Sequence, residues 1–188
     1  MGMSKRYRLW KKSWRERKAQ ILTELGLCQL AEGEWRKAED KLVKAAKISK
    51  KPLISYLSAA TAANAQHAFD RRENYLRVAH KHDKQAAVAI GLTQAKLQLE
   101  SEQWEQALST LQHLDQLSPH HSHILKLLLE INMTLCQWSE CHKLLRSVKK
   151  YKAVTKKLYD QYEYDINLAL LKEMAAKGEN LKSFWQLE

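Results

Sequence analysis

The chain has 188 residues, of which 45% are hydrophobic and 28% charged, and this composition excludes disorder for most of its length. Five glycines and two prolines are too few for the frequent turns of an all-β fold, so we predict an all-α protein. The formal net charge of +11 comes from two blocks: residues 1–18 hold eight basic residues against one acidic, and residues 143–157 hold seven against none.

The first predicted helix, near residues 5–32, begins in the basic N-terminal segment, residues 1–18. Trp10 and Trp14 are four residues apart and therefore share one face of this helix. Indoles among cations are typical of a helix at an anionic membrane surface, and we predict that contact for these residues: Trp10, Lys11, Lys12, Trp14, Arg15 and Arg17. Packing of both indoles on the first repeat remains an alternative. Nucleic-acid binding is disfavoured because the cations occupy one end of the chain.

Residues 19–154 contain a repeat of about 34 residues, which predicts a solenoid of antiparallel helix pairs. Aromatic residues recur at spacings of 34, 35 and 34: Trp35, Phe69, Trp104 and Trp138. A leucine follows each aromatic residue by seven positions: Leu42, Leu76, Leu111 and Leu145. Mostly small residues precede each by nine positions, where they let two helices approach: Gly26, Ala60, Ala95 and Leu129.

These motifs resemble the tetratricopeptide repeat, in which Leu22-x-x-Leu25-Gly26 would open the first helix and Trp35-x-x-Ala38 the second. Arg72 and Cys141 depart from the small residue found at the position of Ala38. We assign a basic N-terminal segment, four repeats and a partial fifth pair: 1–18, 19–52, 53–87, 88–121, 122–154 and 155–188. After the first helix, further helices are predicted near 35–49, 52–67, 70–81, 85–101, 104–116, 120–135, 138–150 and 154–177, with a partial one from 180. Because the last pair is incomplete, we expect the chain to be a fragment or to pair with another segment.

The repeats that this chain resembles use the first helix of each pair to line an inner groove. We predict a partner groove of apolar residues with sparse polar ones: Leu27, Tyr56, Leu57, Asn64, Leu92, Lys96, Lys126 and Met133. Within it, Asn64 and Lys96 are predicted polar anchors for an extended or helical partner segment. A clamp for a peptide C-terminal carboxylate is disfavoured, because Thr23 and Leu27 stand where such a groove needs lysine and asparagine.

The second basic block, residues 143–157, spans a predicted helix end and the loop after it. Cations near a helix C-terminus complement the helix dipole, which is one explanation of the block. The alternative is a surface for an acidic partner.

No pattern of catalytic or metal-binding residues stands out. The chain has no glycine-rich phosphate loop, no His-Glu-x-x-His and no Cys-x-x-Cys. The histidines around 120–123 point in different directions at a helix start, and an odd number of cysteines favours a reducing compartment: Cys28, Cys136 and Cys141. We therefore predict no catalytic residue, no metal site, no cofactor and no enzymatic activity.

Beyond the generic repeat, residues 26–39, 52–60 and 91–98 resemble the HemY family of proteobacterial inner-membrane proteins, which is distinct from the protoporphyrinogen oxidase of the same name. The resemblance implies two membrane helices ahead of a helical-repeat domain and an association with protohaem biosynthesis. A basic segment directly after a membrane span predicts that the repeat domain faces the cytoplasm.

Together these observations predict a non-enzymatic scaffold at the inner membrane that binds other proteins, among them haem-biosynthesis enzymes, and no nucleic acid. Two alternatives stay open. The first is a porphyrin or haem carrier that uses a groove histidine or Tyr56, and the second is a peptide-binding adaptor unrelated to haem.

Overall fold

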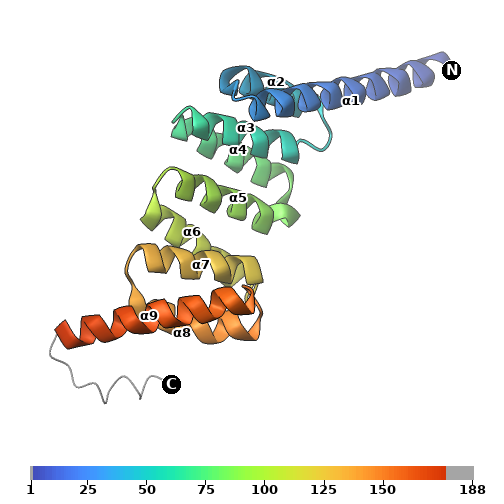
Figure 1. Ribbon diagram of the computed structural model, residues 1–188. Coiled ribbons are helices and arrows are strands. Elements are labelled where there is room, and N and C mark those ends of the chain that lie inside the picture. Colours follow the sequence, from blue (N-terminus) through green and yellow to red (C-terminus); the bar gives the residue numbers. More distant parts are fainter. Residues whose placement is uncertain (1, 177–188) are drawn as a thin grey trace. The chain divides into compact units, whose positions relative to one another are not determined.

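The computed structural model describes residues 2–176, and within them the backbone forms nine α-helices, one short 3-10 helix and no strand (Figure 1). The helices are α1 (Gly2–Ala31), α2 (Trp35–Ile48), α3 (Leu53–Ala65), α4 (Phe69–His82), η1 (Lys84–Ala86), α5 (Ala87–Glu100), α6 (Trp104–Leu117), α7 (Ser122–Thr134), α8 (Trp138–Lys150) and α9 (Lys156–Ala176). The predicted all-α class is confirmed, and these bounds lie within a few residues of the predicted ones. The helix predicted from residue 180 lies outside the described residues.

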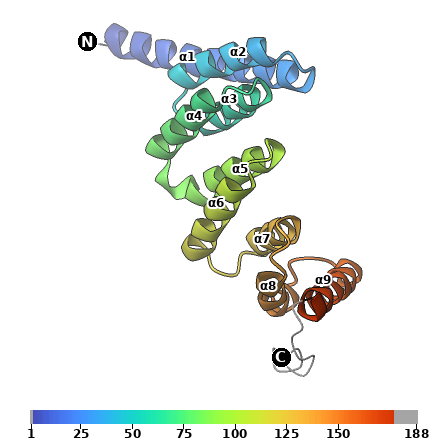
Figure 2. The same ribbon diagram turned by 90° about the vertical axis from the view of Figure 1, so that its left-hand side faces the viewer.

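The chain divides into two compact units, Met1–Ser101 and Glu102–Glu188. In the first unit each of α1 to α4 packs against the next helix, and α3 also contacts both α1 and α5. In the second unit α6, α7, α8 and α9 pack in the same consecutive manner (Figures 1 and 2). Each unit is therefore a stack of neighbouring helices, the arrangement that the 34-residue period predicts.

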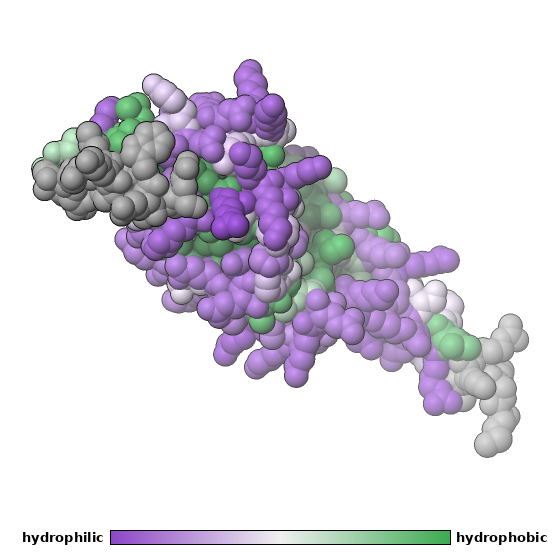
Figure 3. Space-filling view, turned by 90° about the horizontal axis from the view of Figure 1, so that it is seen from below, coloured by the Kyte–Doolittle hydropathy of each residue, from purple (hydrophilic) through white to green (hydrophobic). Residues whose placement is uncertain are grey.

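The columns of the repeat form the cores of both units. The leucine column is buried at every copy, with exposed fractions of 0%, 3%, 0% and 5% at Leu42, Leu76, Leu111 and Leu145. The position three residues further on is buried as well, at Ala45, Ala79, Leu114 and Val148. The aromatic column is less buried, and Trp35 is 38% exposed. Between these columns the helices present polar residues to water, as the predominance of hydrophilic side chains in Figure 3 illustrates.

Gly26 marks the closest approach of α1 and α2. A Cβ atom added there would lie 2.7 Å from Cγ and 2.9 Å from Cδ2 of Leu42. Because Leu42 is fully buried, it has no free space into which to move. The small residue at this position is therefore required by packing, as the sequence pattern predicts.

The four turns within helix pairs share one backbone geometry. Two residues before each aromatic residue the chain adopts a positive φ: 78° at Gly33, 55° at His67, 57° at Glu102 and 54° at Cys136. This left-handed residue ends the first helix of the pair, and in the second turn the Ala68 amide donates to the Ala63 carbonyl at 2.9 Å. Only the first turn uses glycine, so three of the four turns carry no glycine signal in the sequence.

Arg72, which departs from the small-residue pattern, is 2% exposed. Its guanidinium donates to Oδ1 of Asn64 at 2.8 Å, pairs with Glu73 at 2.8 Å and lies 4.9 Å from the ring centre of Phe69. The same Asn64 oxygen accepts a hydrogen bond from Ser101 Oγ at 2.9 Å. A buried arginine thus links α3, α4 and the end of α5 at a position where the other repeats carry alanine or cysteine.

Candidate partner-binding surfaces

A cleft opens in the first unit between α1 and the segment that enters α3. It has a volume of about 440 Å³ and is lined by these residues: Glu16, Ala19, Gln20, Thr23, Glu24, Ser49, Lys50, Lys51, Ile54 and Ser55. The hydroxyls of Thr23 and Ser55 lie 2.9 Å apart and join the two helices. Ile54 is 62% exposed and presents an apolar side chain at the edge of the cleft. We call this feature the α1–α3 cleft; it combines one accessible apolar side chain with polar walls.

Three of the predicted groove residues lie on α1 and α3, the helices that border this cleft, although none of the three lines it. Leu27 is exposed on α1, whereas Leu57 is half-buried in a cluster with core residues of α3 and α4. The Tyr56 ring stacks on Tyr75 and on His82 of α4, with ring centres 6.4 and 5.9 Å apart. The Tyr56 ring is therefore largely engaged in packing between the two helices of its own pair.

Three other predicted groove residues lie on α3 and α5. Asn64 is 6% exposed, and its side chain serves the network with Arg72 described above. Leu92 is half-buried, and Lys96 is exposed with its Nζ 3.8 Å from Glu100. Of the two predicted polar anchors, only Lys96 therefore presents its side chain to solvent.

The last two predicted groove residues belong to the second unit. Lys126 lies 3.6 Å from Glu130, whose carboxylate also accepts a hydrogen bond from the Tyr162 hydroxyl of α9 at 3.0 Å. Met133 is half-buried and packs against the cluster formed by α7, α8 and α9. Both side chains are partly accessible and partly held by neighbours.

The structure divides the predicted membrane-contacting residues between two faces of α1. Because the helix is continuous, successive side chains are about 100° apart around its axis. Trp10 and Trp14, 63% and 51% exposed, share a face with the exposed Tyr7, Ile21 and Leu25; we call these five residues the indole stripe. The Lys18 ammonium lies 5.0 Å from the Trp14 ring centre.

Lys12 and Arg15 lie at least 100° away from both indoles by the same geometry. With Arg8, Lys11 and Glu16 they face the end of α2, where they enclose a volume of about 350 Å³ together with Lys47, Ile48, Ser49 and Lys50. We call this the α1–α2 cationic pocket. Arg17 does not line it and falls on the side of the indoles. Lys47 and Lys50 are not among the predicted site residues, although antiparallel pairing of the first two helices brings them to the basic segment.

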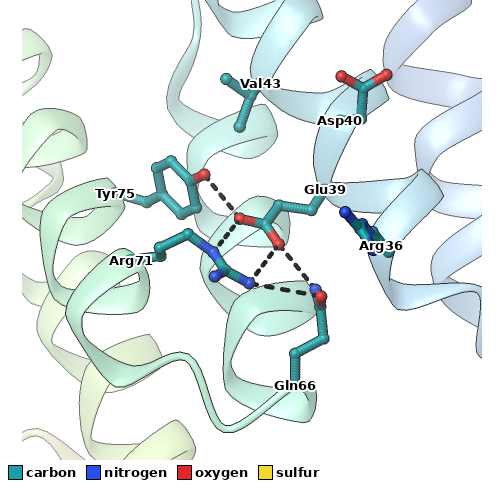
Figure 4. Close-up of a pocket in the computed structure, with 7 residues that line it drawn as sticks. All are labelled: Arg36, Glu39, Asp40, Val43, Gln66, Arg71 and Tyr75. Atoms are coloured by element: carbon teal, nitrogen blue, oxygen red, sulfur yellow. Dashed lines mark hydrogen bonds and ion pairs between the residues drawn. The ribbon is translucent and has the colours of Figure 1, made fainter.

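Figure 4 shows a network around Glu39, which is also absent from the predicted site residues. The network borders a pocket of about 520 Å³ between α2 and the second helix pair. Glu39 is 8% exposed and accepts hydrogen bonds from Arg71 Nε at 2.8 Å, the Tyr75 hydroxyl at 2.8 Å and Gln66 Nε2 at 2.7 Å.

Burial alone would raise the pKa of Glu39, but these three donors and the Arg71 charge hold it below its usual range. Burial and the contact with Glu39 raise the pKa of Tyr75 to about 12.

The pKa of Glu39 predicts a pH-dependent stability. A lowered carboxyl pKa stabilises the fold above the unfolded value, and this contribution is lost as the pH falls through the folded value. At neutral pH we expect Glu39→Gln to lower the free energy of unfolding by about 1–2 kcal/mol, because the charge that holds Arg71 and Tyr75 is removed. The difference from wild type should shrink below about pH 4.

Urea unfolding at neutral pH and near pH 3 measures this difference. Asp40→Asn is the matched control, because Asp40 is the next residue of α2 but is exposed and pairs with the exposed Lys44 in the i,i+4 position. That variant should stay within about 0.5 kcal/mol of wild type. A Glu39→Gln difference that is the same at both pH values would contradict the expectation.

The second basic block both ends α8 and lines a cleft. Lys149 and Lys150 occupy the last turn of α8, where cations complement the helix dipole. Lys143, Arg146 and Lys149 also line a volume of about 500 Å³ between α8 and α9, with these further residues: Ser139, His142, Leu145, Tyr159, Glu163 and Asn167. The Lys149 ammonium lies 5.2 Å from the Tyr159 ring centre.

Other candidate chemistry is sparse in the part of the chain that the structure describes. Within residues 2–176, no three His, Cys, Asp or Glu side chains converge as metal ligands would, and no helix has the length and apolar content to span a bilayer. The cysteines are free thiols. Cys28 and Cys136 are exposed, and burial raises the pKa of the Cys141 thiol to about 12, which keeps it protonated.

Comparison with solved structures identifies the fold. The chain superposes on Pseudomonas aeruginosa pilF with a TM-score of 0.59 at 17% identity, over 92% of this chain and 76% of that one. It superposes on YrrB, described as a TPR protein with an unusual peptide-binding site, with a TM-score of 0.56 at 12% identity, over 96% and 86% of the two chains. The predicted tetratricopeptide-repeat fold is therefore confirmed.

Comparison of sequences supplies the relationship. Residues 1–67 match the family described as HemY protein N-terminus. Proteins named HemY from Escherichia coli K12 and Shigella flexneri are 24% identical over 179 residues, which cover 94% of this chain. The chain spans 45% of the length of these relatives. The resemblance to the HemY family is thus confirmed, over residues 1–67 by the family match and over most of the chain by the HemY relatives.

Proposed function

We propose that this chain is a non-enzymatic protein-interaction module whose first helices bind a segment of a partner protein. The α1–α3 cleft carries the proposal, because an accessible isoleucine between polar walls provides an apolar contact and hydrogen-bonding groups that orient a peptide. The peptide-binding site in the description of the fold neighbour YrrB supports the same function.

The proposed contact surface follows the accessible groove residues of each unit. In the first unit it comprises Leu27, Ile54, Leu57, Leu92 and Lys96, and in the second unit Lys126 and Met133. Tyr56 and Asn64 act behind this surface, because packing on α4 and hydrogen bonding to Arg72 occupy their side chains. They shape the groove and are not proposed to touch the partner.

The proposed partners are enzymes of haem biosynthesis. The match to HemY proteins supports this assignment, which the repeat fold by itself does not provide. A porphyrin carrier that uses Tyr56 is less well supported, because its ring is stacked against Tyr75 and His82.

Site-specific photocrosslinking tests the groove and the partner together. With p-benzoyl-phenylalanine at Ile54, membranes that contain the full-length protein should yield adducts with a haem-biosynthesis enzyme. Lys81 is the control position, since it is exposed on α4 of the same unit. A haem-pathway protein that is recovered equally from both positions, or from neither, would contradict the proposal.

We further propose that the indole stripe of α1 rests on the anionic cytoplasmic face of the inner membrane, with Arg17 beside it, whereas Lys11 belongs to the α1–α2 cationic pocket. The exposure of Trp10 and Trp14 supports this placement, because an interface accommodates indole rings that water does not favour.

Vesicle cosedimentation tests this contact. Trp10→Ala/Trp14→Ala should bind phosphatidylglycerol-containing vesicles about 30-fold more weakly, since each of the two indoles loses on the order of 1 kcal/mol of interfacial burial. Leu117→Ala/Tyr164→Ala removes two comparably exposed apolar side chains of the second unit, 54% and 67% exposed, and should bind as wild type does. Equal binding by both variants would argue against the placement.

A further inference from the structure

The α1–α2 cationic pocket gathers charge from two helices. Arg8, Lys11, Lys12 and Arg15 of α1 face Lys47 and Lys50 at the end of α2. Among the described residues that line the pocket, Glu16 supplies the one negative charge. Six cations around a volume of about 350 Å³ create a local positive potential that attracts anionic groups.

The cations are close enough to perturb one another. Hydrogen bonding to Lys12, followed by desolvation and the Lys12 charge, lowers the pKa of Lys50, and Glu16 only partly opposes this effect. Like charges held together are unfavourable unless an anion neutralises them. An anionic ligand in the pocket would relieve this repulsion.

The pocket adjoins the α1–α3 cleft. Glu16, Ser49 and Lys50 line both of them. Because these three residues are shared, the pocket cations lie next to the polar residues of the cleft that contains Ile54. A single bound segment can therefore contact both the cations and Ile54. The indole stripe lies on another side of α1, and a membrane surface that contacts the indoles therefore does not fill the pocket.

We propose that the partner segment is acidic and binds its carboxylates in the α1–α2 cationic pocket while an adjacent apolar residue contacts Ile54. This inference rests on the proposed function and specifies the chemistry of the partner. Carboxylates match the ammonium and guanidinium donors of the pocket through charge-assisted hydrogen bonds.

A fluorescein-labelled oligo-glutamate of about ten residues is the probe, measured by fluorescence anisotropy at low ionic strength. Lys47→Gln/Lys50→Gln should weaken its binding about 10-fold, because two pocket cations are lost. Lys81→Gln/Lys84→Gln, two exposed lysines of the same unit, lowers the net charge equally and should change binding less than about 2-fold. Both variants are expected to fold, because the substituted side chains lie at the surface.

Equal weakening in the two variants would overturn the proposal, since it would mean that only total charge matters. Failure of oligo-glutamate to bind wild type would overturn it as well. So would a pocket variant that loses binding to phosphatidylglycerol vesicles but not to oligo-glutamate, because the pocket would then serve lipid headgroups. Photocrosslinking from Ile54 distinguishes failure of this proposal from failure of the proposed function. If Ile54 still crosslinks to its partner while Lys47→Gln/Lys50→Gln binds oligo-glutamate as the control variant does, the acidic-segment proposal fails and the proposed function stands.

Discussion

Gly26→Val is expected to lower the free energy of unfolding of the first unit by about 2–3 kcal/mol. The first added carbon alone would lie 2.7 Å from Leu42 Cγ and 3.3 Å from the Leu42 backbone nitrogen. The Leu42 side chain is fully buried, so either that side chain leaves its position or α1 and α2 move apart. Separation would loosen both the core of the first repeat and the first wall of the α1–α3 cleft.

Urea unfolding followed by circular dichroism measures the effect, and the melting temperature should fall by about 10 °C. Ala31→Val is the matched control, because it places the same side chain at an exposed position of the same helix. Helix propensity costs that variant about 0.5 kcal/mol. A Gly26→Val protein as stable as the control would show that the two helices do not require this close approach.

The sequence predicts much of this fold because the repeat gives the spacing of equivalent positions along the chain. Four copies of one pattern identify the buried leucine column and the small residue at Gly26 without knowledge of any contact. The turns are harder to predict. A positive φ is usually predicted from glycine, but three of the turns place other residues there: His67, Glu102 and Cys136. Their geometry is imposed by the helix pairs that they join.

The candidate surfaces are predicted less completely, since they depend on contacts between helices. Helical periodicity alone could have separated the indoles from Lys12 and Arg15. The contribution of Lys47 and Lys50 requires the pairing of α2 with α1, and the network around Glu39 requires contacts 27 to 36 residues apart along the chain. Asn64 also depends on a contact between helices. Its position in the repeat predicts a groove residue, whereas its side chain accepts a hydrogen bond from Arg72.

Arg72→Ala is expected to lower the free energy of unfolding by about 3 kcal/mol, because a long buried side chain is replaced by a methyl group and leaves a cavity. The loss also removes the guanidinium hydrogen bond to Asn64, although the Ser101 hydroxyl still donates to the same oxygen. The other repeats carry Ala38, Ala107 and Cys141 at this position, all fully buried, so alanine itself is compatible with a repeat. The expected cost therefore reflects a local packing that has formed around the arginine.

Arg72→Met separates volume from charge. Methionine fills most of the space left by the arginine, and Glu73, which is 45% exposed, can be solvated once its partner is gone. If filling the space is the main contribution, Arg72→Met should lie within about 1 kcal/mol of wild type, since losing the hydrogen bonds to Asn64 and Glu73 is offset by no longer burying a charge. If Arg72→Met is as unstable as Arg72→Ala in the same urea titration, the polar contacts of the guanidinium, to Asn64 and Glu73 among others, supply most of the stabilisation. In that case, if the bond to Asn64 is the main contact, Asn64→Ala should cost as much as either arginine variant, and combining it with Arg72→Met should add nothing further.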